Sequence, residues 1–224
     1  MKRYLYSIPF LLSGLCLCVS QSASAATTES VELKVTGVLS MGACYPVLDN
    51  GGVVDYGKIS NHALESAAPN DLGKKSINLT VTCDNAHVAG FTITDNAAAS
   101  AMTGGVGAIA GTNAFGLGQT AGGVNLGSYS ITMASVTLDG TDGDVLSSSD
   151  SGASWGAAAD GGLADNAGTT VWSAGAAGVD DTAAAATAFV YGIDVNAVLQ
   201  DSATLAITDD TQLAGSATFT LVYP

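Results

Sequence analysis

Positive charge is scarce in this chain. Lysine and arginine together number 6, against 20 aspartate and glutamate residues. Two of the six, Lys2 and Arg3, lie ahead of Glu29, the first acidic residue, and the remaining four are all lysines. Binding to nucleic-acid phosphates needs clustered basic side chains, and so does electrostatic docking on anionic lipid. The composition therefore excludes both classes of partner.

Charge of either sign is also sparse. Only 12% of the residues are charged and 6% are aromatic, while 47% are hydrophobic. The mean hydropathy is +0.35, whereas disordered chains combine low hydropathy with a high charge density. There are four prolines and 28 glycines, and no proline-rich linker interrupts the chain. These features predict one folded domain with a buried core.

The first 25 residues have the pattern of a secretory signal peptide. Lys2 and Arg3 form a positive start, an apolar stretch runs from about Tyr4 to Val19, and small residues at 23–25 provide a cleavage site after Ala25. A membrane anchor is the alternative, but the apolar stretch is short for a span of about 20 residues. We therefore expect an exported chain that is not inserted in a membrane after cleavage.

Cysteine use fits an oxidising compartment. Cleavage after residue 25 removes two of the four cysteines and leaves Cys44 and Cys83, an even pair that predicts a disulfide. Such a bridge closes a loop of about 40 residues and would stabilise the fold by roughly 4 kcal/mol. Zinc binding with His62 and His87 is the alternative, but the spacing matches no zinc-finger pattern. We expect no metal and no cofactor.

Alternation of apolar and polar residues dominates the sequence after the leader. It is clear in 31–39, 77–83 and 217–223, and it predicts strands there. Further strand-like runs are 52–59, 88–94, 129–138, 168–173, 188–199 and 203–208. Turn signals such as Asp139-Gly140 separate them. Many short strands with glycine-rich turns predict an all-β sandwich or barrel.

The middle of the chain gives a weaker signal. Residues 96–123 and 140–187 are rich in Ala, Gly, Ser and Asp. We interpret them as long loops and irregular strands, and their low side-chain volume suggests a surface feature rather than core. Residues 40–224 are expected to form one domain.

The two ends of the mature chain suggest a function. Residues 26–39 form an extension with strand-like alternation and no tight hairpin to the next strand-like run, and 217–223 end the chain with a second such strand. Unpaired strands invite pairing with another chain. An extended segment can add to the sheet of a neighbour, with backbone hydrogen bonds giving affinity and alternate side chains filling pockets. Because this contact is head-to-tail, it produces open filaments.

The sequence resembles subunits of chaperone–usher pili (fimbriae) in four motifs. Val35-x-Gly37-x-Leu39 is followed by Cys44, Val54-Asp55-Tyr56-Gly57 resembles an internal segment of the family, and Ile77-x-Leu79 leads to Cys83. At the C-terminus, Phe219-x-Leu221-x-Tyr223 carries the penultimate tyrosine. In Cys44-Tyr45-Pro46 and Gly52–Ile59 the sequence more closely resembles a less-studied branch of these subunits, first catalogued as a domain of unknown function. The resemblance covers both ends and leaves the middle unmatched.

The resemblance implies an incomplete immunoglobulin-like β-sandwich that a donated strand completes. A periplasmic chaperone would lend this strand, and an outer-membrane usher would exchange it for the extension of the next subunit. The chain would then be a structural subunit of a cell-surface fimbrium that supports adhesion. The donor positions would be Val31, Leu33, Val35, Gly37 and Leu39. The edge strand that meets the chaperone would carry Ala217, Phe219, Leu221 and Tyr223.

Two other functions are alternatives. A minor or tip subunit could recognise a host surface or sugar through residues 96–187. A hydrolase could use Ser154 in Gly152-x-Ser154-x-Gly156, but this motif needs a preceding strand and a following helix, and both histidines lie upstream. We therefore expect no enzyme. The cluster Asp139, Asp142 and Asp144 resembles part of a calcium loop but lacks its final glutamate, so a solvated turn is the favoured interpretation.

Overall fold

The computed structural model describes residues 32–37, 43–158 and 161–224. The chain divides into two units, residues 1–39 and 40–224. The predicted signal peptide, Val31 and Leu39 lie outside the described residues. In residues 32–37 no strand pairing is assigned.

The second unit is an all-β domain, which confirms the predicted class. Its strands are β1 (Cys44–Leu48), β2 (Asn70–His87), β3 (Gly90–Asp95), β4 (Phe115–Gly116), β5 (Gly127–Leu138), β6 (Thr141–Ser148), β7 (Gly156–Ala157), β8 (Val171–Ala176), β9 (Ala186–Leu199) and β10 (Ala217–Val222). One short helix, α1 (Ser202–Leu205), and 3-10 turns at Asp49–Gly52, Asn61–Ala63, Ala98–Ser100 and Gly111–Asn113 complete the described elements.

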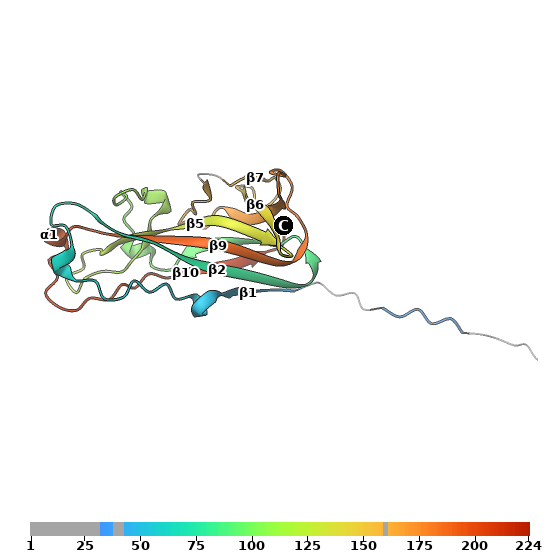
Figure 1. The fold of residues 1–224 in the computed structure, drawn as a ribbon, viewed down its shortest axis with the longest axis horizontal. Helices are drawn as coiled ribbons and strands as arrows, with labels where there is room; N and C mark the ends of the chain where they lie inside the picture. The colour runs from blue at the N-terminus through green and yellow to red at the C-terminus, as the bar shows by residue number, and fades with distance from the viewer. Residues whose placement is uncertain (1–31, 38–42, 159–160) are drawn as a thin grey trace, which may run out of the picture. The chain divides into compact units, whose positions relative to one another are not determined.

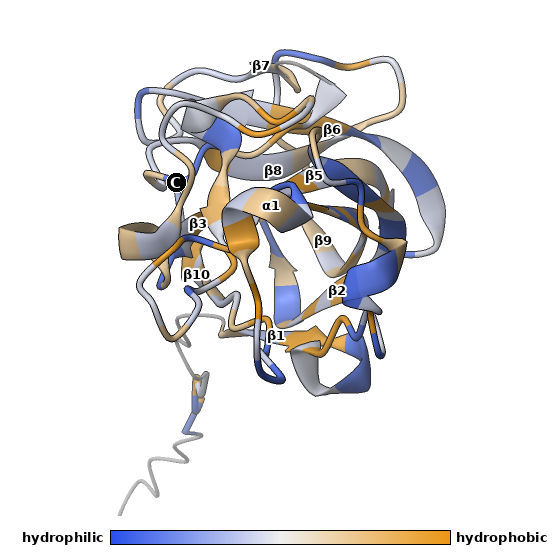
Figure 2. Cartoon of the chain, turned by 90° about the vertical axis from the view of Figure 1, so that its left-hand side faces the viewer, coloured by the Kyte–Doolittle hydropathy of each residue, from blue (hydrophilic) through white to orange (hydrophobic). Residues whose placement is uncertain are grey.

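The strands form a single curled sheet. Their order is β1-β2-β9-β5-β6-β8-β3-β10, with β4 added beside β5 and β7 beside β6, and every pairing is antiparallel. Figure 2 shows the strands following one another around a central interior. The sheet nearly closes on itself, and this arrangement is consistent with a β-sandwich. The two strands that end the order, β1 and β10, are the first and last of the described strands (Figure 1).

Alternation produces the long strands as predicted. In β2, Ile77, Leu79, Val81 and Cys83 are buried while Asn78 and Thr82 are exposed. β9 buries Phe189, Tyr191 and Ile193 in the same way. Asp139 and Gly140, with φ of 48° and 82°, make the tight turn between β5 and β6, as hairpins with such residues require. The buried core is therefore formed by the strand faces that the alternation of apolar and polar residues specifies.

Two of the strand-like runs were wrong predictions. Residues 52–59 contain no strand, because Gly52 and Gly57 have φ of +81° and +71°, which is incompatible with a continuing strand. Residues 203–208 overlap α1, since the Asp201 carboxylate accepts a 2.8 Å hydrogen bond from the Thr204 amide and caps a helical turn.

The middle of the chain is only partly a loop. Residues 96–123 are mostly irregular, as expected, but residues 140–187 contribute β6 and β8. Leu146, Trp172 and Ala174 from these strands are at most 1% exposed, so the interpretation of this region as surface was wrong. Small residues serve close packing here: a Cβ on Gly175 would collide with the carbonyl oxygen of Val179.

A candidate strand-accepting groove

A groove of about 920 Å³ lies beside the two edge strands of the sheet. Its lining includes Ile77 of β2, Ile131 of β5, and Ile193 and Val195 of β9. Leu48 of β1 and Phe219 of β10 belong to the same lining. Side chains from the interior face of the sheet therefore form the floor of this opening, although Ile77, Ile131 and Ile193 are each at most 7% exposed.

The side walls of the groove are two segments outside the strands. One wall is 52–61 and the other is 209–216, each with most of its residues in the lining. Among the described residues, neither segment belongs to a strand ladder. The two walls therefore flank an opening at the edge of the sheet.

Tyr56 holds the first wall against the sheet. Its hydroxyl donates a 2.8 Å hydrogen bond to the carbonyl oxygen of Val195 in β9, and the ammonium of Lys75 lies 5.5 Å from the ring centre. Burial raises the pKa of the Tyr56 hydroxyl. The adjacent turn is fixed because Asp55 accepts a 2.7 Å hydrogen bond from the Gly57 amide. The Val54-Asp55-Tyr56-Gly57 motif thus forms an anchored wall.

Gly215 and Tyr129 shape the second wall. A Cβ on Gly215 would lie 2.7 Å from Cε1 of Tyr129, so only glycine allows this close approach without a shift. The Ala214 amide donates a 2.8 Å hydrogen bond to the carbonyl oxygen of Leu117. Tyr129 is buried, and burial raises the pKa of its hydroxyl well above the ordinary range, with the Asp95 carboxylate acting in the same direction.

The free edge of β10 carries the predicted edge-strand residues. Thr218 and Thr220 are exposed, while Ala217, Phe219 and Leu221 are half-buried. Their neighbours across the ladder, Ile93 and Phe91, are both 1% exposed. Because the Ser216 carbonyl accepts from Asn96 of the β3 side, alternation directs the backbone groups of residues 217, 219 and 221 away from β3. Within the described part of the chain, β10 therefore lacks a neighbour on this side.

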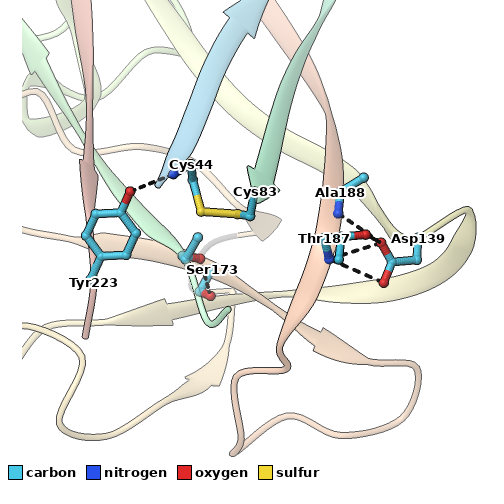
Figure 3. Close-up of a disulfide and its surroundings, with 8 residues drawn as sticks. Cys44, Cys83, Asp139, Ser173, Thr187, Ala188 and Tyr223 are labelled. Atoms are coloured by element: carbon cyan, nitrogen blue, oxygen red, sulfur yellow. Dashed lines mark hydrogen bonds between the residues drawn. A yellow bond between two sulfur atoms is a disulfide. The ribbon is translucent and has the colours of Figure 1, made fainter. Parts of the chain in front are cut away.

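At the start of β1, a disulfide and a hydrogen bond connect this strand to its surroundings. Figure 3 shows the Cys44–Cys83 disulfide, which joins β1 to β2 and confirms the predicted pairing. In the same view the Cys44 amide donates a 2.9 Å hydrogen bond to the hydroxyl of Tyr223, just after β10. This contact brings the free edges of β1 and β10 together at the disulfide, beyond the end of the groove.

Residues 32–37, the described part of the predicted donor segment, expose large apolar side chains. Leu33 and Val35 are both 88% exposed, and a Cβ on Gly37 would meet nothing within 4 Å. Glu32 and Lys34, on the other parity, form a 3.8 Å ion pair. The segment therefore presents two large apolar side chains that the described residues leave uncovered.

The remaining candidate residues do not assemble into a site. Ser154 is exposed and donates a hydrogen bond to Asp150 in a loop that leads to β7, not to a helix. His62 is exposed and His87 is half-buried in β2.

The predicted aspartate cluster does not form a binding site either. The Asp139 carboxylate accepts from the Thr187 hydroxyl and from the amides of Thr187 and Ala188 (Figure 3). Hydrogen bonding to Thr187 lowers the pKa of Asp139. Asp144 accepts instead from Gly178. Across residues 32–37, 43–158 and 161–224, no three His, Cys, Asp or Glu side chains gather as a metal site.

Sequence reasoning missed the floor and walls of the groove. Ile131, Ile193 and Val195 alternate within predicted strands, but nothing local to them shows that a neighbour is absent. Tyr56 belongs to a recognised motif, yet the motif alone assigns it no contact. The usable signal was the pair of strong strands at the two ends of the chain.

In the part of the chain that the structure describes, no helix has the length and apolar character needed to cross a membrane.

Comparisons with known proteins relate the sequence to one protein family and to two Escherichia coli proteins. Residues 33–130 match a family described as "protein of unknown function (DUF1120)". In an alignment of 152 residues that covers 61% of this chain and 63% of the relative, the chain is 33% identical to the uncharacterized protein YhcF of Escherichia coli (strain K12). In an alignment of 159 residues that covers 62% of this chain and 61% of the relative, it is 31% identical to the protein GltF of the same strain. The similarity thus spans less than two thirds of each relative, and it agrees with the expected likeness to a family first catalogued as of unknown function.

Proposed function

We propose that this chain is a structural subunit of a surface fimbrium, assembled by strand donation from copy to copy. The observation that carries the proposal is the apolar groove between two unpaired edges of an antiparallel sheet, in a chain that also has an exposed alternating apolar segment. Residues 26–39 of one copy would fill the groove of the next. Residues 40–224 would form the accepting domain, and no catalysis would be involved.

The dimensions of segment and groove support this pairing. Residues 31–39 span roughly 30 Å when extended, and the walls 52–61 and 209–216 are of similar length in residues. Val31, Leu33, Val35 and Leu39 share one parity, so they would all point into the groove. Burial of one such side chain contributes about 1.5–3 kcal/mol. Leu33 and Val35 alone would therefore add about 3–6 kcal/mol.

The geometry of this contact sets the form of the assembly. The segment and the groove are different surfaces of the chain, so the interface is head-to-tail and does not close on itself. A subunit with an empty apolar groove would aggregate during export. The proposal therefore includes a periplasmic chaperone that covers the groove, an outer-membrane usher that releases it, and neighbouring subunits as the final partners at the cell surface.

Charge substitutions on the two faces of the segment test the proposal. Leu33→Asp places a carboxylate in the groove, whereas Thr36→Asp adds the same charge on the solvent face. Cells that produce each variant are examined by unheated SDS gels and negative-stain microscopy. The proposal predicts a heat-sensitive ladder and fibres for wild type and Thr36→Asp, and their loss for Leu33→Asp. Ladders of equal strength in all three would refute it.

A further inference from the structure

Beyond the disulfide end of the groove, one hydrogen bond joins Cys44 of β1 to Tyr223, the residue after β10. We infer that Tyr223 acts as an end-stop that fixes the register of the strand entering the groove. This inference rests on the proposed function, because it concerns the position of the donated strand. It assigns Tyr223 a positioning role that differs from that of the apolar residues of β10, which contact the strand directly.

The free edge of β1 offers few backbone amides to an incoming strand. The Asp84 amide donates to the Ala43 carbonyl, so residues 43, 45 and 47 face β2 and residues 44, 46 and 48 face the open side. The Cys44 amide on that side already donates to Tyr223. Pro46 has no amide hydrogen. Leu48 is therefore the first residue of β1 with an amide available to an incoming strand.

The lining of the groove ends at the same place. Leu48 and Phe219 belong to it, whereas Pro46 and Leu221 do not. Tyr223 lies beyond these residues and is 54% exposed. On its other side, Pro224 lies where a Cβ on Gly152 would collide with it. The last two residues of the chain are thus held by contacts with two different parts of the domain.

A stop would sharpen a register that the donor segment specifies weakly. A slip by one residue would turn every apolar side chain outward and is strongly disfavoured. A slip by two residues keeps the same face inward, and because Val31, Leu33 and Val35 are all apolar, the position of Gly37 is the main feature that separates the two registers. A fixed obstacle at one end of the groove removes this ambiguity, so each copy would contact the next at the same spacing.

The test maps the register in fibres of the full-length chain. A photo-reactive residue replaces Leu39 in one variant and Val31 in another, and cross-linked peptides are identified after illumination. Each photo-reactive chain is prepared with Tyr223, with Tyr223→Phe and with Tyr223→Ala. Tyr45→Phe is the matched control, since Tyr45 lies on the same edge strand as Cys44 but is 60% exposed and projects from the outer face.

With Tyr223 intact, each photo-reactive position should give one set of cross-links. Tyr223→Phe should weaken the preference for that set roughly fivefold, the value of one ordinary hydrogen bond, and add a second set displaced by two residues. Tyr223→Ala should show the displaced set more strongly, and Tyr45→Phe should match wild type. Fibres with one unchanged set in both Tyr223 variants would overturn the end-stop while leaving strand donation intact. Absence of any ladder in wild type would overturn both.

Discussion

The backbone amide of Cys44 donates a 2.9 Å hydrogen bond to the hydroxyl of Tyr223, across a sequence separation of 179 residues. Cys44 begins β1, and Tyr223 directly follows Val222, the last residue of β10. Their contact joins the free edges of β1 and β10 at one end. Farther along these two strands, the groove lies between their edges. The first and last described strands are therefore neighbours with a gap between them.

Loss of the disulfide should destabilise the domain strongly. Cys44 and Cys83 enclose a separation of 39 residues, and the chain-entropy model gives about 4 kcal/mol for such a loop. For a domain of this size the melting temperature should fall by roughly 10 °C. The measurement is thermal unfolding of the Cys44→Ala/Cys83→Ala variant beside wild type with and without reductant. Equal melting temperatures in all three samples would contradict the prediction.

Tyr56→Phe should loosen the first wall of the groove. The substitution removes the hydroxyl that donates to Val195 and leaves that carbonyl without this partner, at a cost of about 1 kcal/mol. Lys58 lies in the same wall, so limited trypsin digestion reports on its opening. We predict faster cleavage after Lys58 in the variant, with cleavage after Lys75 of β2 unchanged. A uniform acceleration at both sites would indicate global destabilisation instead.

The loop 148–154 should lose its stabilisation in acid. Hydrogen bonds from Ser154 and Ser148 lower the pKa of Asp150 from 3.8 to about 2. A depressed pKa means that the charged form is favoured in the folded state, so the contribution is present above about pH 4 and is lost as the pH falls toward 2. Asp150→Asn should therefore be less stable than wild type at pH 6, with the difference shrinking toward pH 2. Urea unfolding at both pH values measures it, and Asp142→Asn is the control.

The fold class and the disulfide could be predicted from the sequence because their signals are local. Alternation in 77–83 and 217–223 specifies one buried face, and two cysteines that remain after the predicted leader favour a bridge. Residues 52–59 misled the prediction because their apolar spacing is strand-like while Gly57 turns the backbone. The burial of Trp172 and Leu146 was missed since their surroundings are small residues, whose close packing depends on tertiary contacts. The groove lies where no described strand fills the space between β1 and β10. It becomes apparent only from the arrangement of the whole described sheet.

The most direct test of strand donation is completion of the domain by a peptide. Residues 40–224 are refolded alone, with a synthetic peptide of residues 27–39, or with the same peptide carrying aspartate at positions 33 and 35. Thermal unfolding and size-exclusion chromatography then compare the three. Strand donation predicts a stable one-to-one complex with the natural peptide and little folded protein in the other two samples. Equal stability with and without the natural peptide would contradict it.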